Sequence, residues 1–382
     1  MSDAAPYGAM GRGVKPGAVR APKGAFGRGM AGAPGGEITG RPSIAGRSGL
    51  LRAVLLLAAL LAVLLPAAGP AEAQKAPAAP APKPAPGKAG GKAAPADAKA
   101  APDDPSVVDL AYGAYQRGHF LTAYNEALKR AQAGTDPAAM TLLGELYGRG
   151  FGVPYDPVRA REWYQKAAKA GSADALFALG LMALTGRGDK PDEEKAAKLF
   201  RQAADKGNGA AAYNLGLLYL QGRAMPQDFT EAAHWFEEAS QHDLEDALYA
   251  LAVLYKEGNG VDKDLVQSAK LMARAARLGH VTAQVELAIM LFNGEGVPKD
   301  EQAAAALFRK AALAGNAIAQ NRYARLLAVG RGVAQDKVAA ATWHLMAKKR
   351  GLGDPMLDQV VDGLSASERL NAEARARKWG GG

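Results

Sequence analysis

The feature of this chain that most constrains its fold is a pattern that repeats every 36 residues. An aspartate, a glycine and an alanine each recur at this interval through six consecutive units. The three series are Asp156, Asp192, Asp228, Asp264, Asp300 and Asp336; Gly150, Gly186, Gly222, Gly258, Gly294 and Gly330; and Ala167, Ala203, Ala239, Ala275, Ala311 and Ala347. A fixed period of this length is typical of structural units that stack in tandem and bury their apolar surfaces against one another. The period therefore predicts an array of similar units.

Each unit is predicted to be a hairpin of two helices, here named helix A and helix B. In the first unit, apolar residues between Ala139 and Tyr147, and again between Ala160 and Ala168, recur at the spacing of one helical face. The glycine-rich segment GRGFGV separates the two patterns and breaks helix A. The repeated aspartate falls just before helix B, where its carboxylate can cap the first turn. A further glycine, replaced once by Asp243, is predicted to end helix B in the left-handed conformation.

The middle of helix A carries a small residue in every unit. This series is Gly144, Gly180, Gly216, Ala252, Ala288 and Ala324. Glycine inside a helix costs about 1 kcal/mol relative to alanine, so another interaction must offset that cost. We expect a close approach between helices at this point, with Trp163, Trp235 and Trp343, or leucine in the other units, filling the space beside the small residue.

These units resemble Sel1-like repeats, which are relatives of the tetratricopeptide repeat. The resemblance is clearest in YNLGLLYLQGRAMPQDFTEAAHWFEEAS (residues 213–240) and LFNGEGVPKDEQAAAALFRKAALAG (residues 291–315), and it covers roughly residues 107–354. Two turns depart from the pattern, because Ala224 and Met225 replace the usual glycine and valine, and Asp189 replaces valine. We expect those turns to differ in shape. The resemblance implies an all-α, right-handed superhelical solenoid whose surface binds other proteins without catalysis.

The repeats are predicted to fill residues 105–354, with a shortened first hairpin between Val107 and Gly134 and capping helices in 355–382. Ser365 and Glu368 have the spacing of a capping box that opens the last helix, and so do Asp228 and Glu231 before one helix B. A stacked array needs a polar cap at each end, which is the role expected of both terminal segments.

The residues before the repeats divide into three predicted segments. Residues 1–49 are basic and rich in glycine and proline, a composition that favours a lack of fixed structure, and residues 74–104 form an Ala/Pro/Lys-rich linker. Residues 50–73 contain an apolar run of 13 residues after Arg52 and end in Ala71-Glu72-Ala73. This order is typical of a secretory signal cleaved after Ala73, which predicts a periplasmic protein.

Two alternatives to cleavage remain open, because 46 residues precede Arg47 and leader segments are normally short. Translation could start later, for example at Met30. The apolar run could instead stay in the inner membrane as an anchor, with the repeats in the periplasm. In that case the membrane is contacted only through residues 50–73.

The charge of the chain is concentrated in its N-terminal part. The net charge is +9, yet eight basic and two acidic residues lie before Ala53, and the predicted linker adds five lysines against three aspartates. The repeats are therefore nearly neutral. Proteins that bind nucleic acids carry their basic residues on the folded surface, so this distribution argues against nucleic acid as a partner.

Few residues of the sequence have the spacing of a catalytic or metal-binding site. His234, Glu238 and His242 share a helical face, but the chain has no cysteine and scattered surface histidines are more common than metal sites. No serine from residue 105 onward has a lysine three residues later, as a serine acyl-transfer site would require. We therefore predict no catalytic residues, metal or cofactor.

A partner-binding surface is predicted on helix A. Leu142, Ala178, Asn214, Ala250, Glu286 and Arg322 share one position of the repeat and change from apolar to amide to charged. This row is consistent with a specific peptide-binding surface and equally with exposed positions that vary freely. We select Asn214, Glu286 and Arg322 as candidate contacts. The leading hypothesis is a monomeric scaffold that binds envelope proteins; the alternatives are a glycan-associated or enzyme-associated envelope protein and a membrane-anchored spacer.

Overall fold

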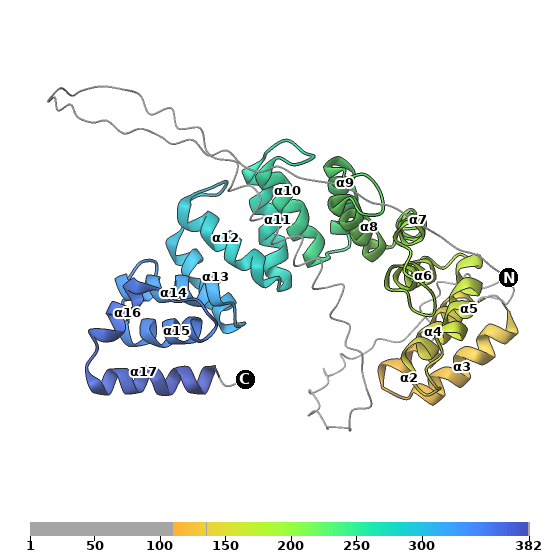
Figure 1. Cartoon of the computed structure of the whole chain (residues 1–382), viewed down its shortest axis with the longest axis horizontal. Coiled ribbons are helices and arrows are strands. Elements are labelled where there is room, and N and C mark those ends of the chain that lie inside the picture. Colours follow the sequence, from red (N-terminus) through yellow and green to blue (C-terminus); the bar gives the residue numbers. More distant parts are fainter. Residues whose placement is uncertain (1–109, 135, 381–382) are drawn as a thin grey trace, which may run out of the picture. The chain divides into compact units, whose positions relative to one another are not determined.

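The computed structural model describes residues 110–134 and 136–380, and within them every regular element is a helix (Figure 1). The helices are α2 (Leu110–Gln116), α3 (Phe120–Ala133), α4 (Pro137–Arg149), α5 (Pro157–Lys169), α6 (Ala173–Thr185), α7 (Glu193–Ala204), α8 (Gly209–Gln221), α9 (Phe229–Ser240), α10 (Glu245–Glu257), α11 (Leu265–Leu278), α12 (Val281–Asn293), α13 (Glu301–Leu313), α14 (Ala317–Val329), α15 (Lys337–Lys349), α16 (Pro355–Asp362) and α17 (Ala366–Trp379). The segments predicted in 1–49, 50–73 and 74–104 lie outside the described residues.

The helices pair as predicted. The even-numbered helices from α4 to α14 are the A helices of six units, and each packs against the following odd-numbered B helix. Each B helix also packs against the next A helix, so the units form a continuous series. The short hairpin α2–α3 begins this series, and α16 and α17 end it by packing on α15. The predicted all-α solenoid is confirmed. No helix in the described part of the chain has the length and apolarity needed to cross a membrane.

Capping explains where the helices begin. The repeated aspartate accepts a backbone hydrogen bond at the start of every B helix, as in Asp300, whose Oδ1 accepts from the N–H of Ala303 at 2.8 Å. Ser365 and Glu368 form a complete capping box before α17. The box predicted at Asp228 is incomplete, because the carboxylate of Glu231 accepts a hydrogen bond from Nε1 of Trp235 at 3.1 Å. A nearby indole donor has taken the place of the backbone N–H.

The small residues of helix A make room for a ring from helix B. A Cβ atom added to Gly144, Gly180 or Gly216 would lie 2.6, 2.5 or 2.7 Å from the nearest ring atom, and the rings belong to Tyr164, Phe200 and Phe236. In the first and third units, the expectation that Trp163 and Trp235 fill this space was therefore wrong by one residue. One residue is about a quarter of a helical turn, so Trp235 faces sideways into the cluster that joins the second and third units.

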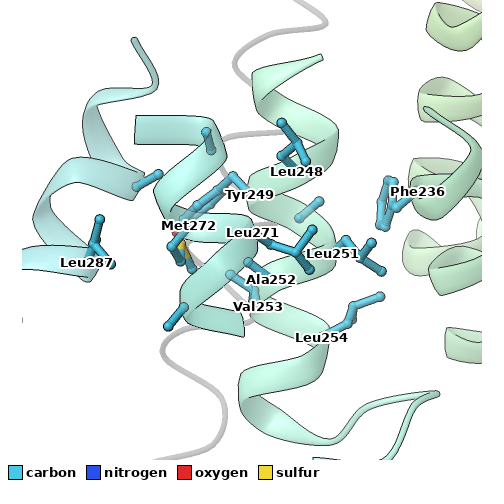
Figure 2. Packing of buried hydrophobic residues seen from close by; sticks show 14 of the residues in the cluster. Phe236, Leu248, Tyr249, Leu251, Ala252, Val253, Leu254, Leu271, Met272 and Leu287 are labelled. Carbon is cyan, nitrogen blue, oxygen red and sulfur yellow. The ribbon is translucent and has the colours of Figure 1, made fainter. Parts of the chain in front are cut away.

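Buried side chains from consecutive helices form shared clusters. In the central cluster, Phe236 of α9, Leu251 of α10, Met272 of α11 and Leu287 of α12 belong to one group of apolar side chains (Figure 2). Because each cluster draws on more than one unit, no unit has a core of its own.

The two turns expected to differ do so. In the third unit, Ala224 replaces a glycine that has a φ near +70° in the other units, and Ala224 does not share that positive φ. The turn of the second unit has an additional hydrogen bond from the N–H of Asp189 to the carbonyl oxygen of Gly186 at 3.3 Å.

Candidate partner-binding surface

The residues of the predicted row on helix A differ in solvent exposure. Leu142 and Ala250 are 8% and 6% exposed and belong to core clusters, whereas Asn214 and Glu286 are half-buried and Arg322 is exposed. The row is therefore a surface only in part. Its exposure does not change in a simple order along the array, because the buried Ala250 lies between the half-buried Asn214 and Glu286, and only Arg322 of the last unit is exposed.

The three candidate contacts have different environments. Nδ2 of Asn214 donates a hydrogen bond to the carbonyl oxygen of Ala210 in the same helix at 2.8 Å, which leaves its Oδ1 available. Oε2 of Glu286 lies 2.7 Å from Nζ of Lys256 in the preceding unit. Arg322 makes no ion pair or hydrogen bond through its side chain with any other described residue, so its guanidinium is available to a partner.

Sequence reasoning missed an aromatic and polar group next to Glu286. The ring of Tyr249 stacks on His280, with centroids 4.4 Å apart, and Nε2 of His280 lies 3.4 Å from Oδ1 of Asp246. Burial, reinforced by the negative charge of Glu286, raises the pKa of Tyr249 to about 12, so its hydroxyl stays protonated. The signal in the sequence was the pair Tyr213 and Tyr249, which recur 36 residues apart.

His280 has a structural role that fixes this group. Its Nδ1 accepts a hydrogen bond from the N–H of Ala283 at 2.9 Å and caps α12. The proton of the neutral ring then resides on Nε2, facing Asp246. Ser172, Asn208 and Asn316 cap the corresponding A helices of other units, so this histidine replaces a usual capping residue.

The histidines weighed as metal ligands lie in separate environments. His234 is exposed and contacts Trp235, with ring centroids 4.9 Å apart. The ring of His242 lies against Gly209 at the start of α8, where an added Cβ would meet it at 2.6 Å. No group of three or more potential ligand side chains that could hold a metal occurs within residues 110–134 and 136–380.

The model of the Sel1 repeat family matches the chain six times in succession, at residues 137–172, 173–208, 209–244, 245–280, 281–316 and 317–352. These matches cover more than half of the chain. The chain belongs to the Sel1 repeat family. Sel1 repeat proteins are in general scaffolds for protein–protein interaction, and the fold is typically non-catalytic.

Two solved structures are similar to this Sel1 repeat chain. A Sel1 repeat protein from Oxalobacter formigenes has 32% identity and a TM-score of 0.56, and the match covers 64% of this chain and 100% of that one. A protective antigen of uropathogenic Escherichia coli strains, which displays an SLR fold, has 26% identity and a TM-score of 0.61. That match covers 68% of this chain and 56% of the E. coli protein, so the chain spans little more than half of that relative. A comparison with curated proteins found no match.

The two ends of the Sel1 array carry polar networks at one helix A position. In the first repeat, Glu145 accepts hydrogen bonds at 3.2 Å from the hydroxyls of Tyr115 and Tyr164. In the last repeat, Nε of Arg325 lies 2.5 Å from Oδ2 of Asp354, which also accepts from Asn321 at 2.8 Å. The four repeats between them have Leu181, Leu217, Val253 and Ile289 at this position. At this position the first and last repeats thus have a charged residue, and the four middle repeats have an apolar one.

Proposed function

We propose that this Sel1 repeat protein is a non-catalytic scaffold that binds one or more proteins of the bacterial envelope through the row on helix A. One observation carries the proposal. Capping aspartates and buried alanines are the same in all six repeats, whereas the helix A row changes in chemistry from Leu142 to Arg322. An array whose capping and buried residues are constant, and whose helix A row varies, is suited to binding a specific partner protein.

The C-terminal part of the row supplies most of the specificity in this proposal. Arg322 offers an uncommitted guanidinium, and Glu286 with Lys256 offers a half-buried ion pair with side chains 19% and 21% exposed. A charge at the edge of an interface chiefly sets the association rate and the choice of partner. A partner that covers Glu286 and Lys256 must replace the water around both charges, which favours ligands with matching polar groups.

The location in the envelope is proposed from the N-terminal sequence. A basic residue, an apolar run of 13 residues and Ala71-Glu72-Ala73 follow one another in the order of a secretory signal. We expect the chain recovered from a periplasmic fraction to begin at Gln74. A mature chain that retains residues 50–73 and partitions with membranes would instead support the anchored alternative.

The test is a direct binding measurement with a captured partner. Cells expressing the tagged chain are crosslinked, the recovered protein is identified and purified, and its affinity is measured for three forms of the full chain. These are the parent, the triple variant Asn214→Ala, Glu286→Lys and Arg322→Glu, and a matched variant with Gln202→Ala, Glu237→Lys and Lys310→Glu. The matched residues are exposed on three B helices.

We expect the helix A variant to lose at least tenfold in affinity and the matched variant to keep the affinity of the parent. Circular dichroism must show equal helix content, because Glu286→Lys places two lysines side by side. Arg322→Glu alone is the safeguard, since this exposed side chain contributes nothing to packing. Equal affinity of all forms would exclude the helix A row as the binding surface.

A further inference from the structure

The turn of the second repeat lacks an apolar side chain that every other repeat provides. The equivalent residues of the other repeats are Val153, Met225, Val261, Val297 and Val333, and each is partly buried against a core cluster. The second repeat has Asp189, whose side chain is 62% exposed and lies 3.7 Å from Arg161. A side chain that normally fills the space between one repeat and the next is therefore missing here.

A pocket of about 820 Å³ is lined in part by Asp189, the residue that replaces the apolar side chain. Its apolar lining includes Ala168 of α5, Leu176, Leu179 and Met182 of α6, and Leu199 of α7. Ala224 and Arg223 of the next turn complete the lining, so both irregular turns border the pocket. Its volume falls within the range of roughly 300–1,000 Å³ that is usual for ligand sites and exceeds the space of one side chain.

The rim of the pocket has unpaired positive charge. Arg161 pairs with Asp189, Arg223 pairs with Glu193 at 2.6 Å, and Asp192 caps α7. The rim residues without an ion pair to another described residue are Lys169, Lys190, Lys195, Asp192 and Glu194. Three ammonium groups against two carboxylates leave an excess of one positive charge, which favours a ligand with negative charge next to its apolar part.

We propose that this pocket binds an extended peptide segment of a partner protein, with a valine-sized aliphatic side chain flanked by acidic residues. The other repeats show that such a side chain fits. In the first and fifth repeats, a Gly-Val-Pro segment places Val153 or Val297 against the core clusters. A partner segment of the same kind supplies to the second repeat what its own turn lacks, and its acidic residues meet the rim lysines.

This peptide site is separate from the helix A row. None of its lining residues belongs to that row, and it lies between the first and second repeats together with the turn of the third. Peptide binding at this pocket rests on the proposed scaffold function and specifies the chemistry of one partner segment. The triple variant of the helix A row should bind the peptide normally. The experiments can therefore refute the helix A surface and the peptide pocket independently.

The experiment uses a peptide that copies the turn of the fifth repeat with one lysine replaced by glutamate, acetyl-GEGVPED-amide. The full chain is labelled with ¹³C at its methionine methyl groups, and the signal of Met182 is assigned with Met182→Leu. We expect titration to millimolar peptide to shift the Met182 signal and not that of Met290, which is buried in the fifth repeat. The peptide acetyl-GEGNPED-amide should bind at least tenfold more weakly, and 0.5 M NaCl should weaken binding through the lysines.

The deciding variant is Asp189→Val, which restores the residue type of the other repeats. It should occupy the part of the pocket beside the turn, weaken peptide binding at least tenfold and raise the midpoint of urea unfolding. The matched control, Asp262→Val, alters an exposed turn residue of the fourth repeat and should leave peptide binding unchanged. An unshifted Met182 signal, equal binding of both peptides, or unchanged binding by Asp189→Val would each overturn the proposal.

Discussion

The first three and the last three repeats solve the same packing problem with different pairs of residues. In the first three, glycine in helix A lies under the ring of Tyr164, Phe200 or Phe236. In the last three, alanine is found at the glycine position, and Ala252 shares a cluster with Met272 as Ala288 does with Phe308. In the third repeat Gly216 leaves no room for a Cβ beside the ring of Phe236, whereas the fifth repeat accommodates Ala288 in the same cluster as the ring of Phe308.

The largest effect is expected from removing a ring in the first half. Phe236→Ala should lower the free energy of unfolding by about 3–5 kcal/mol, because Gly216 has no side chain that could occupy part of the void. Phe308→Ala should cost less, since the methyl group of Ala288 already lies in the same cluster. Urea denaturation of both variants, followed by circular dichroism, measures the difference. A greater loss for Phe308→Ala would contradict the pairing.

A smaller effect is expected when the small residue of helix A and the ring of helix B in the third repeat are changed to the residue types of the fourth repeat. Gly216→Ala should destabilise the chain by about 1–3 kcal/mol through overpacking, despite the gain in helix propensity, because the new Cβ would lie 2.7 Å from the ring of Phe236. Adding Phe236→Met reproduces the pair found in the fourth repeat and should recover most of the loss. A double-mutant cycle gives the coupling energy. Additive effects of the two substitutions would show that the residues do not act as a pair.

The fold could be predicted from sequence because the repeat displays its own periodicity. The ladders of aspartate and glycine located the helix ends, and the helical spacing of apolar residues located the hairpins. The choice of Trp163 over Tyr164 was wrong because a period gives a position along the helix more accurately than the direction of a side chain. Both residues are large and aromatic, and only the packed structure separates their directions.

The candidate surface was less predictable than the fold. A shared repeat position does not fix exposure, so Leu142 and Ala250 proved to be buried while Arg322 is exposed. The pairing of Glu286 with Lys256 depends on the distance between neighbouring A helices, which the sequence does not give. The sequence showed that Asp189 replaces the usual valine at the turn beside the pocket. The volume of the pocket, however, depends on three helices and two turns.

The C-terminal end of the array should respond to acid. Burial would raise the pKa of Asp354, but hydrogen bonds from Arg325 and Asn321 outweigh it and lower the pKa from 3.8 to about 2. Since the folded pKa is depressed, the carboxylate stabilises the fold above about pH 4, and this contribution is lost as the pH falls toward 2. The loss should be about 1–2 kcal/mol, visible as faster amide hydrogen exchange in α14 and α16.

The matched variant for this prediction is Asp354→Asn. It should have faster exchange at every pH and a flatter pH dependence between 4 and 2, because the titrating group is gone. The first repeat is the internal comparison. Its network includes Tyr164, whose pKa is raised by burial, so this hydroxyl remains a donor across the acid range. Unchanged pH dependence in Asp354→Asn would assign the acid response to other carboxylates.

The smallest effect is expected in the third repeat, where the two halves meet and Asp243 replaces the glycine that follows helix B. Asp243 is the only non-glycine residue with positive φ in the described part of the chain, at 52°. Its carboxylate also pairs with Arg274 at 2.7 Å, an exposed contact that contributes little to stability.

Asp243→Gly and Asp243→Ala both remove that contact, but only alanine keeps a Cβ in the left-handed conformation. The glycine variant should therefore be more stable by about 1 kcal/mol, measured by urea denaturation. Gly279→Ala, at the equivalent position of the fourth repeat with φ 116°, should be destabilising for the same reason. If glycine and alanine were equivalent at position 243, this turn would have relaxed away from the left-handed conformation, and the third repeat would no longer match its neighbours.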